Sequence, residues 1–269
     1  MWICVACGNH YPTAPAPPSR CDICSDERQW VHPEGQRWAT PEELSAGHRT
    51  DIRDIEPGLI GIGVKPAVGI GQRALLVITA EGNLLWDPPG FLDAAAVDRV
   101  RAEGGLRAVT ASHPHFYGAI SEWASLFGAE VIVPQVDQHW MTNPPATVRT
   151  WRESLAVLPG VTLVQCGGHF PGSAVVHWAE GAGGAGALLA GDTIFVTPGE
   201  DRVTFVWSAP NRLPLPAPAV QGVAEAVDGY DFDRIYGGWW EPVVRSQAKR
   251  ILQASARRYI EIMQGDIPV

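Results

Sequence analysis

Apolar residues recur along the chain in two spacings, one typical of strands and one typical of helices. Short apolar runs bounded by glycine or polar residues predict strands. These runs are GLIGIGV, RALLVIT, EGNLLWD, LRAVT, AEVIVP, VTLVQC, SAVVHWA and GALLAGD. We expect EGNLLWD to pair with RALLVIT as a hairpin through a Gly-Asn turn. The glycine- or proline-rich runs EGAGGAGA, GIGVKPAVGIGQ and LPLPAPA are expected to be loops.

Three segments have the spacing of a helix with one apolar face. FLDAAAVDRVRAE and GAISEWASLFG are both closed by glycine, which commonly ends helices. The apolar face of the first consists of Phe91, Leu92, Ala95, Ala96 and Val100. The last segment, VVRSQAKRILQASARRYIEIM, places on one face Val244, Ala248, Ile251, Leu252, Tyr259 and Met263. Because strands and helices alternate, the predicted fold class is α/β, with sheets covered by helices.

Composition limits the kinds of partner. With 269 residues, 46% of them apolar, the chain can form one large domain with a small appendage. A net charge of −9 and the lack of any Lys/Arg-rich run argue against nucleic acid. The apolar runs fall short of the roughly 18 residues that cross a membrane. The N-terminus MWICVACG does not have the pattern of a signal peptide, so we expect a cytoplasmic protein with a small-molecule substrate. Homo-oligomerisation stays open.

Two cysteine pairs predict a metal site near the N-terminus. CVAC contains Cys4 and Cys7, and CDIC contains Cys21 and Cys24. Each Cys-x-x-Cys turn directs two thiolates at one point, so the pairs together form a tetrahedral S4 site for one zinc or iron ion. Redox dithiols or disulfides are the alternative. The Pro-rich segment between the pairs is too short to fold alone, so the metal is expected to stabilise it.

Residues 1–35 therefore resemble a rubredoxin-like or zinc-ribbon module. A closed S4 site has no open position for a substrate, so its expected role is structural, although bound iron would also allow electron transfer. The polar, turn-rich residues 36–56 are expected to be a linker that lies over the main domain, and residues 57–269 form that domain.

Three later segments contain candidate ligands for a second metal. ASHPHFYGAI follows a predicted strand, and in extended backbone His113 and His115 point the same way, with Pro114 favouring that conformation. CGGHFPGSAV places His169 at a turn between two strands, and ALLAGDTIF places Asp192 after another strand. The simpler interpretation is that the histidines lie on the surface and that the aspartate caps a helix or turn.

In this order the three motifs resemble those of the metallo-β-lactamase superfamily, over roughly residues 57–265. The resemblance implies a four-layer αβ/βα sandwich and one metal held by four residues, which are His113, His115, His169 and Asp192. The family's fuller first motif continues with an aspartate and a histidine for a second metal, where this chain has Tyr117 and Gly118. The family's last histidine is replaced within GGWW, which contains Gly238, Trp239 and Trp240. The resemblance thus implies a mononuclear site for Zn, Fe or Mn.

The expected activity is hydrolysis of a small ester or thioester by a water bound to that metal. We expect Tyr117 to donate a hydrogen bond to a developing oxyanion and Asp192 to accept the proton of the water. Trp207, Trp239 and Trp240 either wall an apolar substrate pocket or only pack in the core. The alternatives are a mononuclear iron oxygenase acting on a sulfur substrate and an inactive binding protein. Cys166 is expected to be an inert thiol, and the remaining histidines are expected to be structural or at the surface.

Overall fold

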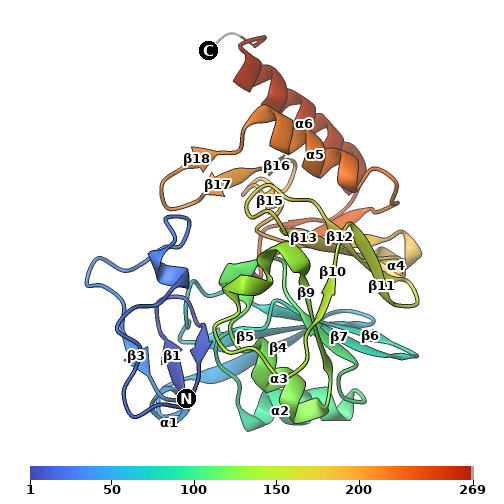
Figure 1. Cartoon of the computed structure of the whole chain (residues 1–269). Coiled ribbons are helices and arrows are strands. Elements are labelled where there is room, and N and C mark those ends of the chain that lie inside the picture. Colours follow the sequence, from blue (N-terminus) through green and yellow to red (C-terminus); the bar gives the residue numbers. More distant parts are fainter. Residues whose placement is uncertain (268–269) are drawn as a thin grey trace. The chain divides into compact units, whose positions relative to one another are not determined.

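The computed structural model describes residues 1–267, which form two compact units (Figure 1). The first unit comprises residues 1–133 and 137–150, and the second comprises residues 134–136 and the chain from Trp151 onward. Each unit contains a sheet and helices. The predicted mixed α/β class is confirmed. No helix within residues 1–267 has both the length and the apolar content needed to cross a bilayer.

A seven-stranded sheet with the order β10-β9-β8-β7-β6-β5-β4 dominates the first unit. Its strands are β4 (Arg49–Glu56), β5 (Leu59–Lys65), β6 (Ala74–Thr79), β7 (Gly82–Trp86), β8 (Ala108–Thr110), β9 (Glu130–Pro134) and β10 (Arg149–Trp151). Strands β4 to β7 form an antiparallel meander, whereas β7, β8 and β9 are parallel. The parallel pairs need crossovers, and α2 (Ala94–Ala102) and α3 (Ile120–Phe127) provide them.

Both crossover helices form where the apolar spacing predicts them. The side chain of Asp93 accepts a hydrogen bond from the N–H of Ala96 and so caps the start of α2. The same carboxylate accepts hydrogen bonds from Thr50, which ties α2 to β4. Gly128 closes α3 in the left-handed conformation, with φ of 63°.

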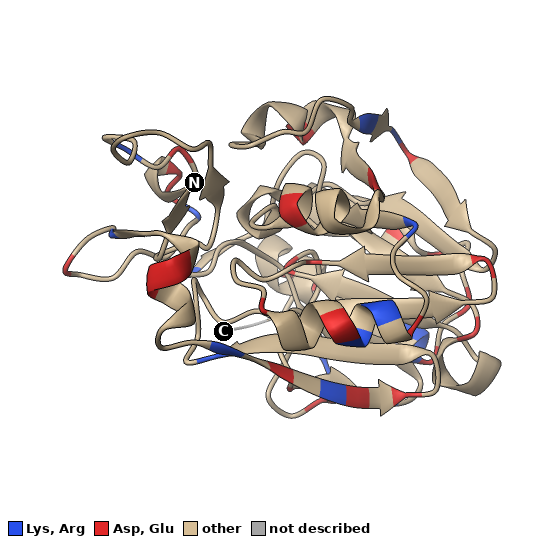
Figure 2. Ribbon diagram, turned by 90° about the horizontal axis from the view of Figure 1, so that it is seen from below, with Lys and Arg blue, Asp and Glu red and all other residues tan. Residues whose placement is uncertain are grey.

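The predicted linker, residues 36–56, contains regular structure. It includes β3 (Trp38–Ala39), α1 (Pro41–Ser45) and the eight-residue strand β4. Strand β4 has no apolar alternation because it is the edge strand of its sheet. Positive and negative residues follow each other along it, as Figure 2 shows, and Asp51 lies 2.6 Å from the Arg53 guanidinium and 2.7 Å from the Lys65 ammonium. The boundaries of the three predicted segments stay a prediction.

The second unit is built on a six-stranded sheet with the order β11-β12-β13-β14-β19-β20. Its strands are β11 (Ser154–Leu158), β12 (Val161–Gln165), β13 (Ala174–Trp178), β14 (Ala187–Gly191), β19 (Arg234–Gly237) and β20 (Val243–Val244). Two small pairs are β15 (Phe195–Val196) with β16 (Val203–Thr204), and β17 (Val206–Ser208) with β18 (Leu213–Pro214). The helices are α4 (Gly181–Gly184), α5 (Ala217–Ala226) and α6 (Ala248–Gln264). Helices α5 and α6 pack on each other, and residues of both belong to the apolar core of this unit.

Four local predictions are wrong. Val244 belongs to β20, because α6 begins only at Ala248. Helix α5 starts inside the proline-rich run, since proline is tolerated in the first turn of a helix. The run EGAGGAGA contains the single helical turn α4. The β6–β7 hairpin turns at residues 80–81, because Thr79 already pairs with Gly82.

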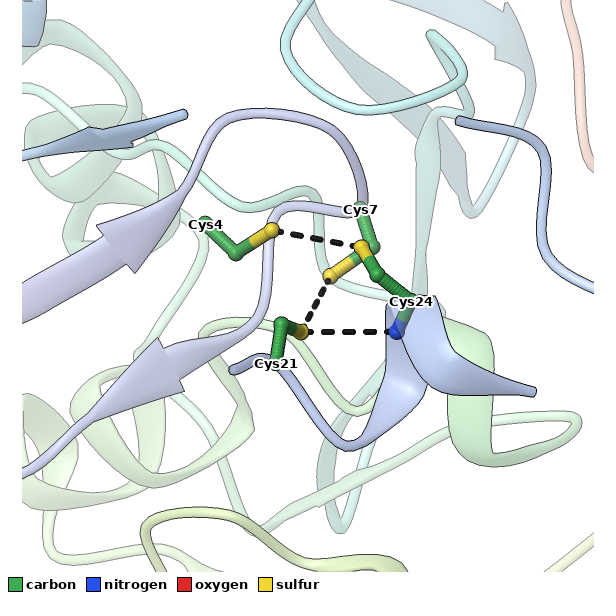
Figure 3. A group of neighbouring side chains, drawn as sticks. All are labelled: Cys4, Cys7, Cys21 and Cys24. Atoms are coloured by element: carbon green, nitrogen blue, oxygen red, sulfur yellow. Dashed lines mark hydrogen bonds between the residues drawn. The ribbon is translucent and has the colours of Figure 1, made fainter. Parts of the chain in front are cut away.

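The N-terminal segment forms a small sheet with the order β2-β1-β3, in which β1 is Trp2–Cys4 and β2 is His10–Tyr11. The Sγ atoms of its four cysteines all lie within 4.8 Å of one another. The Cys4 and Cys24 sulfurs are 3.4 Å apart, and those of Cys7 and Cys21 are 3.6 Å apart (Figure 3). Thiolates about 2.3 Å from a tetrahedral zinc would be roughly 3.8 Å apart. The cluster therefore fits the predicted metal ribbon.

Hydrogen-bond donors surround these sulfurs. The Tyr11 hydroxyl donates to Cys21 Sγ at 3.2 Å, and the N–H of Cys24 donates to the same sulfur at 3.4 Å. Hydrogen bonds from the neighbouring thiols, Cys24 first, hold the pKa of Cys21 well below its ordinary value. The surroundings of Cys21 thus favour its thiolate, the form that binds metal, whereas burial raises the pKa of Cys7.

The ribbon, defined here as residues 1–39, packs closely on loops of the first unit. A Cβ atom on Gly90 would lie 2.4 Å from the Gly8 Cα and carbonyl oxygen, so the two backbones are in direct contact. Buried His10 adds two polar contacts, one to the Gly90 carbonyl at 2.9 Å and one to the Glu122 carboxylate at 3.0 Å. Burial alone would raise the pKa of Glu122, but the His10 imidazole holds that pKa below its usual range. Ile3 of the ribbon and Phe91, which follows Gly90, belong to one apolar cluster.

Substitution of Gly90 tests the contact. Gly90→Ala forces two backbone segments apart, so we expect the free energy of unfolding to fall by about 2 kcal/mol, as in other overpacked sites. Gly47→Ala is the control, because no heavy atom lies within 4 Å of its added Cβ. Urea titrations of the three proteins measure the difference. Equal losses in both variants would contradict the contact.

Thiol reactivity tests the ribbon. With metal bound, we expect no fast-reacting thiol at about pH 8, because the ribbon sulfurs are ligands and burial raises the pKa of Cys166 to about 12. A chelator should expose the four ribbon thiols, and chelator with denaturant should expose all five cysteines. A colorimetric thiol assay gives the counts. Identical rates with and without chelator would show that no metal protects the ribbon.

Candidate metal centre

His113 and His115 follow β8 and lie close together, but not through extended backbone. His113 is extended, with φ of −167° and ψ of 170°, whereas Pro114–Phe116 forms a turn of 3-10 helix, η2. The expectation that His115 lies in extended backbone is therefore wrong, because proline at a first helical position favours the turn. The two ring centroids are still 5.0 Å apart. Both side chains are buried.

Ser112, which precedes His113, fixes the orientation of the His113 ring. Ser112 donates its N–H to Asp87 Oδ1 at 2.6 Å, and its hydroxyl lies 2.9 Å from His113 Nδ1. Burial raises the pKa of Asp87 to about 7, although this hydrogen bond works against the rise. Because Nδ1 is engaged, Nε2 is the nitrogen that His113 would offer to a metal.

His169 lies in the loop between β12 and β13, where the sequence places it, and is buried. Its Nδ1 contacts the main-chain carbonyl of Trp207 at 2.8 Å. A carbonyl only accepts, so Nδ1 carries the proton, and Nε2 is the nitrogen that His169 would offer to a metal. The preceding Gly168 has φ of 89°, and a Cβ there would lie 3.0 Å from the Leu215 side chain. Gly168 therefore allows the backbone conformation of the loop that contains His169.

Asp192 directly follows β14 and is 5% exposed. The next residue, Thr193, donates its hydroxyl to the Ala174 carbonyl at 2.8 Å, which fixes this strand end to β13. Asp192 does not cap a helix, since the next element is the strand β15. A buried carboxylate at a strand end is a suitable metal ligand. The three histidines are likewise buried candidate ligands.

Tyr117 ends η2 and is buried, with 2% of its surface exposed. Within residues 1–267 its hydroxyl makes no hydrogen bond. Burial raises the pKa of Tyr117 well above its ordinary value, and the charge of Asp137 raises it further. The hydroxyl is therefore a neutral donor that a ligand or water can use.

Gly118 has little space around it. A Cβ at this position would lie 3.3 Å from the carbonyl oxygens of Gly8 and Pro88. Both neighbours are backbone atoms, which cannot swing aside as a side chain would. With the ribbon in place, position 118 therefore disfavours a residue as large as histidine.

The three predicted pocket tryptophans lie in the second unit and are partly buried. Trp239 stacks on Phe195, with ring centroids 6.2 Å apart. Trp207 contributes its backbone carbonyl to His169, a role that the sequence does not indicate. Contact of these rings with a substrate stays a prediction.

A cavity of about 770 Å³ borders the loop of His169, and sequence reasoning missed most of the residues that line it. The lining residues are Gln135, Val136, Arg152, Glu153, Gln165, Cys166, Gly167 and Pro171. Cys166, Gly167 and Pro171 belong to the motif CGGHFPGSAV, whereas the other five belong to no recognisable motif and are revealed only by the three-dimensional arrangement. Burial raises the pKa of Cys166 to about 12, in agreement with an inert thiol.

Comparison with known proteins gives matches over most of the chain. The family model of the metallo-beta-lactamase superfamily matches residues 68–242. An uncharacterised protein of Bacillus subtilis strain 168, YmaE, is 38% identical over 269 residues, covering 99% of this chain and 98% of its own. The match therefore extends over the ribbon segment as well as the main domain.

Solved structures agree with the family match. The mono-zinc form of the metallo-β-lactamase FIM-1 from Pseudomonas aeruginosa has a TM-score of 0.57 at 14% identity, covering 78% of this chain and 96% of that one. TTHA1623 in a di-iron-bound form has a TM-score of 0.51 at 21% identity, covering 67% and 92%. At these identities the likeness concerns the fold. Taken with the family match, it means that this chain belongs to the metallo-β-lactamase superfamily.

Proposed function

We propose that the protein is a metal-dependent hydrolase that cleaves a small ester or thioester at one metal ion. The proposed ligands are His113, His115, His169 and Asp192. The observation that carries the proposal is the family match over residues 68–242, a range within which all four proposed ligands lie. Burial of the four side chains adds support.

The donor set suits a divalent transition metal. Three imidazoles and one carboxylate match the preferences of Zn, Fe and Mn. His113 and His169 each engage Nδ1 with a neighbouring oxygen, which is how metal-binding imidazoles are usually held. A bound ion would act as a Lewis acid toward an acyl oxygen and lower the pKa of a water.

A single metal is favoured because the family's second set of ligands is replaced. Tyr117 and Gly118 follow the paired histidines, and Gly238 follows β19. Position 118 is also tightly enclosed by backbone atoms of Gly8 and Pro88. Neither glycine can supply a side-chain ligand.

The chain's own residues have distinct proposed roles. Tyr117 donates its hydroxyl to the oxygen that gains negative charge, because that hydroxyl is buried and makes no hydrogen bond within residues 1–267. Asp192 accepts a proton from the attacking water. The cavity of about 770 Å³ beside the His169 loop has room for a small acyl group. Trp207, Trp239 and Trp240 supply apolar surface.

A second candidate is iron-dependent oxygenation of a sulfur substrate. The observation in its favour is that a protein of similar fold, TTHA1623, binds iron. The mono-zinc form of FIM-1 shows equally that this fold accommodates one zinc. The identity of the core metal therefore separates the two candidates.

Element-resolved metal analysis of protein purified without chelators is the first test. We expect one metal beyond the ribbon's, and hydrolysis of p-nitrophenyl acetate or a small acetyl thioester. His115→Ala should lose the core metal and the activity but keep the ribbon metal. Iron together with oxygen consumption on a persulfide would favour the second candidate. Ribbon metal alone, even after soaking with zinc, iron or manganese, would refute both.

Tyr117→Phe tests the proposed oxyanion donor. Loss of one such donor lowers kcat by about 100- to 1,000-fold in other enzymes, and we expect a fall of that order with the metal content unchanged. The matched control is Tyr230→Phe, which removes a hydroxyl from a tyrosine that packs on His177. Steady-state kinetics of the three proteins provide the comparison. An unchanged kcat in Tyr117→Phe would exclude this role.

A further inference from the structure

Asn9 lies between the ribbon cysteines and the histidine turn and is fully buried. Its amide nitrogen is 3.5 Å from Cys7 Sγ, a predicted ribbon ligand. The same nitrogen donates to the main-chain carbonyl of His115 at 3.2 Å. An amide NH₂ has two hydrogens, so one side chain can make both contacts at once. Asn9 thus joins a ligand of one predicted site to the backbone of a ligand of the other.

The residues on either side of Asn9 hold it in place. The Gly8 carbonyl oxygen lies against Gly118, directly after the histidine turn. On the other side, His10 contacts the Gly90 carbonyl and the Glu122 carboxylate. The carbonyl of Asn9 itself accepts the N–H of Cys4 at 3.0 Å. A displacement of this ribbon segment would therefore move the amide that holds His115.

Metal affinity depends on how well the ligands are held before the ion arrives. Groups that contact a ligand without touching the metal typically change affinity by about 10- to 100-fold when removed. A metal bound to the ribbon would order Cys7, and Asn9 would pass that order to the His115 backbone. By thermodynamic linkage, the core metal must stabilise the ribbon site by the same factor.

We propose that the ribbon is a support for the core metal site and that Asn9 is its positioning residue. This inference rests on the proposed function, because it requires a metal at the core histidines. It assigns the ribbon a task other than electron transfer or substrate binding. The coupling acts through one buried amide and the close backbone contact around it.

The test is core-metal affinity in the full-length protein. Cobalt(II) replaces both metals, and the thiolate charge-transfer band reports the ribbon separately from the imidazole site. Competition with a chelator then gives the dissociation constant of the core site. In Asn9→Leu, which removes the donor at similar volume, and in Asn9→Ala, we expect core binding to weaken about 10- to 100-fold while the ribbon band persists.

Thr142→Val is the matched control. It removes a hydrogen bond of 2.7 Å from Thr142 to the His10 carbonyl, which also links ribbon and main domain but does not touch His115. We expect its core affinity to stay within about twofold of the wild type, well below the change for a ligand-supporting group. A loss equal to that of the Asn9 variants would overturn the assignment to Asn9.

The other outcomes are equally decisive. Wild-type core affinity in both Asn9 variants, with or without the ribbon band, would overturn the proposal. Loss of both metals in a variant whose circular dichroism is unchanged would support it, since the core site would then depend on the ribbon. Asn9→Ser replaces any variant that does not fold. A wild type without core metal would refute the proposed function itself, which keeps the two failures distinct.

Discussion

Gly8 and Gly90 approach so closely that one added methyl group would lie 2.4 Å from a neighbouring backbone atom. This contact sets the distance between the ribbon and the loop after β7. Because these two backbone segments meet without side chains between them, His10 reaches Glu122 and Asn9 reaches the His115 carbonyl. The ribbon consequently belongs to the first compact unit.

The two predicted metal sites differ in chemistry, and their surroundings differ accordingly. In the ribbon, the Cys21 sulfur accepts hydrogen bonds from one O–H and one N–H donor, which stabilise a thiolate. The imidazoles of His113 and His169 instead contact oxygen atoms through Nδ1, which leaves Nε2 to bind metal. The S4 set is softer than the N3O set, although zinc and iron suit both.

Local patterns predicted what depends on local chemistry. The Cys-x-x-Cys pairs, the strand before Asp192 and the loop of His169 all follow from spacing and turn residues. Strand β4 was missed because an edge strand needs no apolar alternation. The turn at Pro114 was missed because proline suits both extended backbone and the start of a helix.

Contacts to backbone carbonyls cannot be predicted from the sequence. The Trp207 carbonyl that orients His169 and the His115 carbonyl that Asn9 holds belong to the main chain, which every residue has. Only the fold decides which carbonyl faces which donor. The same applies to Gly8 and Gly90, whose lack of side chains matters only because they meet.

The hydrogen bond from Asn9 to His115 spans 106 residues of sequence. During synthesis the cysteine pairs leave the ribosome long before the turn on which the ribbon will rest. The ribbon can acquire its metal at that stage, because all four thiolates lie within the first 24 residues. Docking must wait until β8 and the following turn have emerged and folded. The order of translation thus makes the four ribbon cysteines available to a metal before His113, His115, His169 and Asp192 have been synthesised.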